Sequence, residues 1–356
     1  MLDILYAVLM SGLGDVYYYL SEHVLTCLMP AFFIAGAIAA FVKKEAILKY
    51  FGPKVKKRVS YPIASVSGAV LAVCSCTILP LFAGLYKKGS GIGPATAFLY
   101  SGPAINILAI VYTANVLGYQ LGLARGLAAI SMAFLIAFLM SYLFKDHDHE
   151  NHKKNTDYIS GDHREPERPL WIKLSFFGLL VGILIVGASS LGWAPKLAVI
   201  YVLTLIVSVI LIYHYERHEV TRWGYETWDL TVKIFPILIA GTFIVGIIAY
   251  FIPPETFRPY LGNNDLSSAF LGAVIGAILY MPTLLEVPII GTTFGYSSGV
   301  MGDAPALSLL LAGPSLSLPN MIVLYRIMEF KQWLAYIVMV VVLSTFMGFT
   351  YGIIVG

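Results

Sequence analysis

The chain has 356 residues, of which 58% are hydrophobic and only 12% charged, and its formal net charge at pH 7 is +3. Soluble globular chains contain about a quarter of charged residues, so this composition excludes a soluble protein and predicts one that crosses a membrane several times. The small net charge says little about partners, because the placement of charges matters more than their sum in a membrane protein. We expect the lipid bilayer and a small solute as partners, and no nucleic acid.

Uncharged runs recur from one end of the chain to the other. A bilayer core about 30 Å thick requires roughly 20 apolar residues per crossing helix. Residues 1–15 are shorter and carry an acidic residue at each end, which predicts an interfacial helix. The ten predicted membrane segments are 16–42, 61–88, 92–118, 120–144, 170–191, 196–215, 228–252, 266–299, 303–326 and 331–355.

Two parts of the chain match each other in order. "GPATAFLYSGPAIN" (93–106) aligns with "APALSLLLAGPSLS" (304–317) at an offset of 211, and "SGAVLAV" (67–73) resembles "IGAILYM" (275–281) at an offset of 208. Pro30 and Pro236, each before an apolar run, match at an offset of 206. An ordered series of this kind indicates an internal duplication.

This duplication predicts the domain organisation. The only long polar stretch has the composition of a flexible cytoplasmic loop. The four predicted parts are a first repeat at 1–144, a polar linker at 145–169, two connecting spans at 170–215 and a second repeat at 216–356.

Basic residues decide whether segments 61–88 and 266–299 cross the bilayer or turn back within it. Cytoplasmic loops collect Lys and Arg. If both segments are re-entrant hairpins, 20 of the 23 basic residues face the cytoplasm, whereas two crossing segments give 12 inside and 11 outside. An odd number of spans then separates the two repeats, which inverts the second. We therefore predict an all-α polytopic membrane protein with about eight spanning helices, two re-entrant hairpins and inverted repeats, an architecture typical of secondary transporters.

Two Gly-Pro pairs interrupt apolar helices near the middle of the bilayer. Proline removes a backbone donor and clashes with the preceding turn, and broken backbone is tolerated in lipid only when it is buried in protein or lines a wet cavity. The freed carbonyls and the helix N-terminus beyond each break could bind a solute. The alternative is a simple proline kink. The candidate residues at the two breaks are Ser101, Gly102, Pro103, Asn106, Gly313, Pro314, Ser315 and Ser317.

Glu286 is the sharpest candidate in the second hairpin. It lies between Pro282 and Pro288, and no basic residue occurs from 259 to 325 to pair with it. An ionisable group at that depth is costly and functional by default, so we predict a proton-coupling role. The alternative is a carboxyl group that caps backbone donors freed by the prolines. Thr283 belongs to the same stretch and to the predicted site.

The tip of the first hairpin carries Cys74, Ser75, Cys76 and Thr77. Two thiols two residues apart could bind one soft ion or a thiophilic solute. The alternative is that these small residues only pack between helices. Cys27 is a weaker candidate for a third thiol.

Two further features have mainly structural interpretations. Arg125 lies close to the outer end of its helix, where we expect it to reach the headgroups rather than meet an anion. The run "HDHENH" (147–152) with His163 could bind zinc or nickel, but a solvated linker is favoured, so no metal site is predicted.

The sequence resembles a known family in two places. "VCSCTILPLFAGLYKKGSGIGPATAFLYSGPAINILAI" (73–110) and "MPTLLEVPIIGTTFGYSSGVMGDAPALSLLLAGPSLSLPNMIVL" (281–324) are similar to the signatures of a family of predicted prokaryotic permeases that includes the efflux permeases for trivalent organoarsenicals. The resemblance implies a permease. It places emphasis on Cys74, Cys76, Pro80, Gly102, Pro103, Asn106, Glu286 and Pro288.

These observations predict a secondary active permease of the cell inner (plasma) membrane, with no cofactor. Its first expected activity is efflux of a thiophilic species such as a trivalent organoarsenical. We expect Glu286 to couple this efflux to the movement of protons. A small sulfur-containing or other anion is the alternative solute. A different class, a membrane thiol oxidoreductase using Cys74 and Cys76, stays open, although no enzyme is predicted because no hydrolase or ATPase motif occurs. A homo-oligomer is compatible with the sequence.

Overall fold

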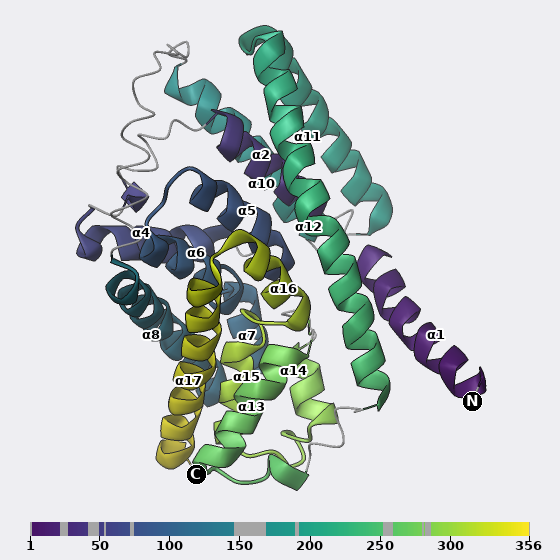
Figure 1. The fold of residues 1–356 in the computed structure, drawn as a ribbon, viewed down its shortest axis with the longest axis vertical. Coiled ribbons are helices and arrows are strands. Elements are labelled where there is room, and N and C mark those ends of the chain that lie inside the picture. The colour runs from purple at the N-terminus through teal and green to yellow at the C-terminus, as the bar shows by residue number, and fades with distance from the viewer. Residues whose placement is uncertain are drawn as a thin grey trace.

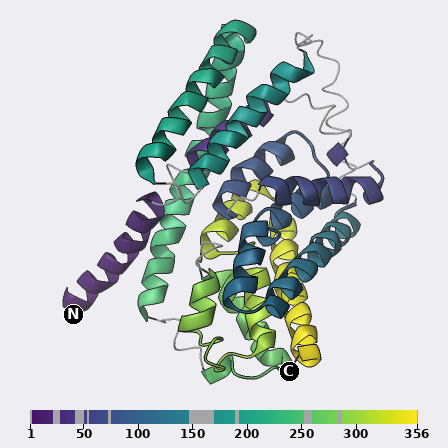
Figure 2. The same ribbon diagram turned by 180° about the vertical axis from the view of Figure 1, so that it is seen from behind.

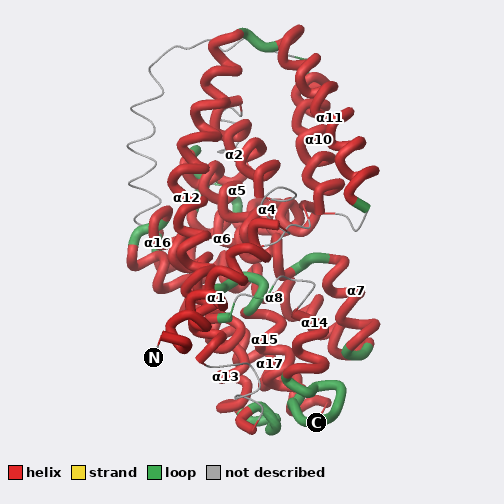
Figure 3. Tube along the Cα trace, turned by 90° about the vertical axis from the view of Figure 1, so that its right-hand side faces the viewer, coloured by secondary structure: helices red, strands yellow, loops and turns green. Residues whose placement is uncertain are grey.

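The structure is a computed structural model that describes residues 2–21, 28–41, 50–52, 55–71, 75–145, 169–188, 192–251, 259–279, 281 and 286–355. These residues form helices joined by turns and contain no strand (Figure 3). The predicted linker lies outside them, except for its two ends.

The first half of the chain forms seven described helices, α1 to α8. α6 and α7 are separated by Ile105 and Asn106 and are bent by 40°. The bounds are α1 Leu2–Tyr19, α2 Met29–Phe41, α4 Lys57–Leu71, α5 Ser75–Lys87, α6 Ile92–Ala104, α7 Ile107–Val116 and α8 Tyr119–Leu143.

The second half begins after the linker with an antiparallel pair, α10 and α11 (Figures 1 and 2). α10 packs on α2, and its Phe176 ring contacts the Trp223 ring of a long helix, α12, with the ring centroids 5.6 Å apart. η4 is a π-helical turn that directly continues α14. The bounds are α10 Leu170–Ala188, α11 Trp193–His214, α12 Arg217–Phe251, α13 Leu266–Ile278, α14 Glu286–Pro288, η4 Ile289–Thr293, α15 Asp303–Ala312, α16 Leu318–Ile327 and α17 Phe330–Val355.

Several helices have the length and hydropathy of membrane spans. Four described helices, α8, α11, α12 and α17, could each cross a bilayer, and the bent pair of α6 and α7 makes a fifth. α2 and α10 are apolar but shorter. The molecule is therefore an all-helical, multi-pass membrane protein, although fewer of its described helices reach spanning length than the eight predicted.

Two helices extend past the predicted segment boundaries. α1 runs through the expected division between residues 15 and 16 and packs along α12, where Gly12 lies against Phe243. α12 starts at Arg217 rather than at residue 228, since Glu219 accepts a hydrogen bond from the backbone N–H of Glu216 (2.9 Å) and stabilises a polar first turn.

The internal duplication is visible in the helix bounds. Shifting α7 by 211 residues gives the bounds of α16, and the same shift moves the start of α8 onto the start of α17. Contacts repeat as well: α4 packs on α6 as α13 packs on α15, and α5 touches α16 as α14 touches α7. The two halves therefore share one arrangement.

A backbone hydrogen bond joins the chain before each predicted hairpin segment to the chain after it. The backbone N–H of Gly91, after α5, donates to the carbonyl of Phe51, before α4 (2.8 Å). In the second half, the N–H of Gly302 donates to the carbonyl of Leu261 (2.8 Å), which joins the same two points of the repeat. The ends of each segment thus lie side by side.

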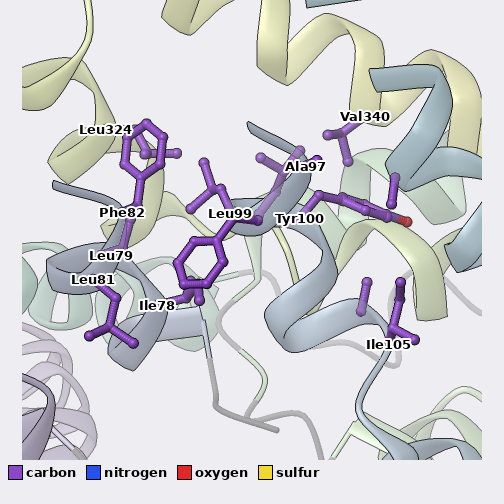
Figure 4. Close-up of a cluster of buried hydrophobic side chains, with 14 of the residues drawn as sticks. Ile78, Leu79, Leu81, Phe82, Ala97, Leu99, Tyr100, Ile105, Leu324 and Val340 are labelled. Carbon is purple, nitrogen blue, oxygen red and sulfur yellow. The ribbon is translucent and has the colours of Figure 1, made fainter. Parts of the chain in front are cut away.

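Apolar packing fixes the position of the first hairpin segment. Figure 4 shows Ile78, Leu79 and Phe82 of α5 beside Leu99 of α6, with Phe82 next to Leu324 of α16. All five side chains are buried. Full burial of a large aliphatic or aromatic side chain contributes about 1.5–3 kcal/mol, so this cluster holds α5 firmly against both repeats.

Candidate functional site

A buried ion pair lies where the two repeats meet. Arg125, on α8, donates through Nη2 to Oε2 of Glu286, the first residue of α14, over 3.2 Å. Neither side chain is exposed to solvent. The pair corrects two expectations: Glu286 does have a cation, which comes from the other repeat, and Arg125 does not reach the headgroups.

The guanidinium group has one more partner on the neighbouring helix. Nη1 of Arg125 donates to Oγ1 of Thr113 on α7 (2.8 Å), and the Thr113 hydroxyl donates to the carbonyl of Ala109 (2.7 Å). These bonds fix the plane of the guanidinium group. α7 and α8 therefore hold the cation and α14 supplies the anion.

Two polar atoms of the pair make no hydrogen bond within the described residues. Among the described residues, neither Nε of Arg125 nor Oε1 of Glu286 has a hydrogen-bond partner, and both atoms are buried. An unpaired buried polar atom costs about 1–3 kcal/mol, more when it belongs to a charged group. Such atoms are expected where a ligand or water binds.

The second Gly-Pro pair lies against this carboxylate. A Cβ atom added to Gly313 would lie 2.8 Å from Oε1 of Glu286, so only glycine leaves the carboxylate its place. α15 ends at Ala312 and α16 begins at Leu318, which confirms a helix break at Gly313-Pro314.

The first Gly-Pro pair differs in position and surroundings. α6 continues through Gly102 and Pro103 to Ala104, so the break expected at this pair is wrong by two residues. Pro103 removes one backbone donor and crowds the preceding turn of α6, and the helix ends directly afterwards, at Ile105 and Asn106. Added to Gly102, a Cβ atom would lie 2.8 Å from Cδ1 of Ile78, an apolar neighbour instead of a carboxylate.

The polar residues after the two breaks also behave differently. The Asn106 side chain caps α7 by accepting from the N–H groups of Leu108 (3.0 Å) and Ala109 (3.4 Å). Ser317 occupies the same position before α16 but makes no such bond. Within the described part of the chain, the Ser317 hydroxyl and both polar atoms of the Asn320 side chain are buried without a partner.

The remaining predicted residues lie near these breaks or outside the described ranges. Ser315 donates to the carbonyl of Tyr100 over 3.5 Å, which joins the two repeats, whereas Ser101 donates within its own helix to Phe98 (3.3 Å). Ser75 and Thr77 are buried at the start of α5. Cys27, Cys74, Thr283 and the His-rich run lie outside the described residues, and Cys76 is placed only as part of α5.

The sequence contained signals for what was missed. Arg125 is the only charged residue of α8, six positions into an apolar helix, and such a residue calls for a partner inside the protein. Tyr100 and Tyr336 were not among the predicted residues. The Tyr100 hydroxyl lies within hydrogen-bond distance of Sδ of Met132 (3.3 Å) and of the carbonyl oxygen of Leu311 (3.4 Å), and Figure 4 shows its side chain pointing away from the side of Phe82. Among the described residues, no group of three or more His, Cys, Asp and Glu side chains could hold a metal ion.

Comparison with known proteins places this arrangement in a family. The sequence profile of a family described as "predicted permease" matches residues 10–353. The chain belongs to this permease family. Its relatives include the UPF0718 protein MJ0584 of Methanocaldococcus jannaschii, 40% identical over 348 residues that cover 94% of this chain and 93% of the relative. No solved structure matches the chain.

A more distant relative is the UPF0718 protein YraQ of Escherichia coli strain K12. It is 24% identical over 263 residues, which cover 74% of this chain and 59% of YraQ. Membership of this family means that the protein is a membrane transporter.

Proposed function

We propose that the protein is a secondary active permease that moves a small solute through a site between the two Gly-Pro breaks. The buried pair of Arg125 and Glu286 carries this proposal. The two charges come from different repeats, two of their polar atoms have no partner among the described residues, and the pair lies against the break at Gly313. Paired ionisable groups inside a membrane protein mark solute and proton pathways.

We further propose that segments 61–88 and 266–299 enter the bilayer from opposite faces and turn back near its middle. The hydrogen bonds of Gly91 to Phe51 and of Gly302 to Leu261, which close the two segments, support this topology. The distribution of 20 of 23 basic residues supports it independently. In this arrangement the linker 145–169 faces the cytoplasm and the protein lies in the inner (plasma) membrane.

The first solute to test is a thiophilic one, such as a trivalent organoarsenical moved by efflux. Its support is the resemblance of the "VCSCT" stretch and the position of Cys76 in the first turn of α5, with Cys74 two residues earlier in the sequence. In this proposal the thiols bind the soft atom and Glu286 takes up and releases the coupled proton. The second solute class is a small anion, and the guanidinium group of Arg125 favours it.

A flux assay tests the proposed function. Inside-out vesicles should accumulate the radiolabelled solute in the wild type, with a rate that depends on the pH gradient. The Glu286→Gln variant should lose that dependence, and the double variant Cys74→Ser and Cys76→Ser should lose the thiophilic solute but keep its fold. Wild-type flux in both variants would remove both proposed roles.

A labelling assay tests the topology. In a chain whose native Cys27, Cys74 and Cys76 are changed to serine, the Lys88→Cys variant should react with a membrane-impermeant maleimide only from the cytoplasmic side. A Lys56→Cys variant, which lies before the segment and faces the cytoplasm in either topology, serves as the cytoplasmic control. Reaction of the Lys88→Cys variant on intact cells would mean that segment 61–88 crosses the bilayer.

A further inference from the structure

The guanidinium group of Arg125 has N–H donors that the ion pair does not use. A guanidinium group has five N–H donors in a planar fork that matches an oxyanion. Arg125 uses one donor on Thr113 and one on Glu286, and its Nε has no partner among the described residues. The carboxylate of Glu286 contributes one oxygen only, so it holds the guanidinium group incompletely.

Electrostatics restricts how a solute could use this cation. Arg125 and Glu286 together are neutral, and both are fully buried. Adding an anion to the intact pair would bury one uncompensated negative charge, which costs several kcal/mol. If Glu286 takes up a proton as a monovalent anion arrives, the site stays neutral. The anion and the carboxylate therefore compete for one cation, and a proton decides the outcome.

The segment that carries Glu286 is suited to such an exchange. Glu286 begins a three-residue helix that passes directly into the π-helical turn η4. π-Helical turns occur frequently at functional sites. By contrast, Arg125 lies inside the 25-residue helix α8, so the cation is the fixed member of the pair and the carboxylate the movable one.

In the part of the chain that the structure describes, few other ionisable groups face the pair. Tyr100 of α6 interacts electrostatically with Arg125 and Glu286, and Tyr336 of α17 lies close to Tyr100. α7 contributes Thr113 and no charged residue, and its Tyr112 is 38% exposed. Proton exchange at the site therefore falls to Glu286.

We propose that Arg125 is the binding residue for a small monovalent oxyanion, and that Glu286 occupies the place of this anion until it is protonated. This inference rests on the proposed permease function and selects the anionic solute class for the same site. Binding then takes up one proton for each anion, and no step requires a metal or a cofactor.

Anion binding to the purified full-length protein in detergent tests this inference directly. Formate, acetate and nitrate are titrated calorimetrically into the protein in chloride at constant ionic strength. Because binding takes up a proton, the dissociation constant of each anion should rise by up to about tenfold for each unit by which the pH is raised. Repeating the titration in two buffers of different ionisation enthalpy should give an uptake of one proton per anion. Binding without proton uptake in the wild type would overturn the inference, and this result requires no variant.

Two variants separate the roles of the pair. Glu286→Gln leaves the cation without a competitor, so the anion should bind at least about tenfold more tightly at neutral pH, without proton uptake. The double variant Arg125→Gln and Glu286→Gln removes both charges, should fold, and should bind no anion. Anion binding by the double variant equal to that by Glu286→Gln would overturn the inference.

The vesicle assay distinguishes this result from a failure of the proposed function. Flux of a neutral trivalent methylarsenical without any anion binding would keep the permease and overturn the anion site. Proton-linked anion binding without flux of any solute would keep the anion site and overturn the permease.

Discussion

The two Gly-Pro breaks share a backbone frame and differ in chemistry. Gly102 and Gly313 are equivalent at an offset of 211, and their nearest side chains, Ile78 and Glu286, are equivalent at an offset of 208. Arg125 likewise corresponds to Tyr336. The duplication thus provides two similar sites, and a few substitutions make one of them polar and leave the other apolar.

The helix ends after the breaks repeat this difference. Asn106 satisfies the first turn of α7, whereas Ser317 leaves the first turn of α16 without a side-chain cap. Side-chain capping removes donors that could otherwise bind a solute. Both differences gather the free polar groups at the second break, so we expect variants of Arg125, Glu286 and Ser317 to affect solute binding and variants of their counterparts to affect stability alone.

The largest difference should come from the equivalent residues Arg125 and Tyr336. Arg125→Gln leaves Glu286 buried without its cation, which should lower the free energy of unfolding by about 3–5 kcal/mol. Tyr336→Phe should change it by less than about 1 kcal/mol, because the buried hydroxyl has no partner among the described residues. Denaturation in detergent, followed by circular dichroism, compares the two.

The double variant Arg125→Gln and Glu286→Gln is the control for this comparison. It should recover most of the stability lost in Arg125→Gln. Equal losses in Arg125→Gln and Tyr336→Phe would show that the ion pair has no special place in the structure.

A smaller difference is expected from the glycines where each hairpin helix meets its break. A Cβ atom at Gly68 would meet Oγ of Ser101 and lie 2.8 Å from the carbonyl oxygen of Phe98, and one at Gly276 would lie 3.0 Å from the backbone nitrogen of Gly313. Both changes to alanine should destabilise by about 1–3 kcal/mol, because each Cβ atom also meets backbone atoms, which cannot turn aside as a side chain can. The loss should be greater for Gly68→Ala in thermal unfolding, and the reverse order would contradict the packing described here.

The smallest difference concerns the caps. Asn106→Ala should cost about 1 kcal/mol, the usual effect of losing an N-cap. Ser317→Ala should change stability by a few tenths of a kcal/mol, since its hydroxyl caps nothing. Thermal unfolding of the two variants in one detergent measures both, and an equal loss would mean that Ser317 does cap α16.

Much of the frame could be predicted from the sequence because it depends on local patterns. Hydrophobic runs locate α8, α10, α11 and α17 to within a few residues, and the offset of 211 gives the order of the repeated helices. Helix ends differ from the predicted segments where polar residues begin a helix, as at Arg217, and from the predicted break where a helix contains an internal proline, as at Pro103.

The candidate site was only half predictable for a different reason. Glu286 stands out in the sequence by its charge, but its partner is 161 residues away, so no local pattern connects them. Running the repeat alignment through Pro80 and Pro288 would have placed Glu286 over Ile78 and shown that the acid has no counterpart. The pairing itself depends on how the two repeats pack.

The most direct test is solute flux in reconstituted vesicles, measured as a function of pH for the equivalent variants Glu286→Gln and Ile78→Val. It shows whether solute transport and its coupling to protons depend on the second break. The account predicts that Ile78→Val keeps the wild-type rate and pH profile, while Glu286→Gln loses the dependence on pH. A Glu286→Gln profile that coincides with that of the wild type would contradict it.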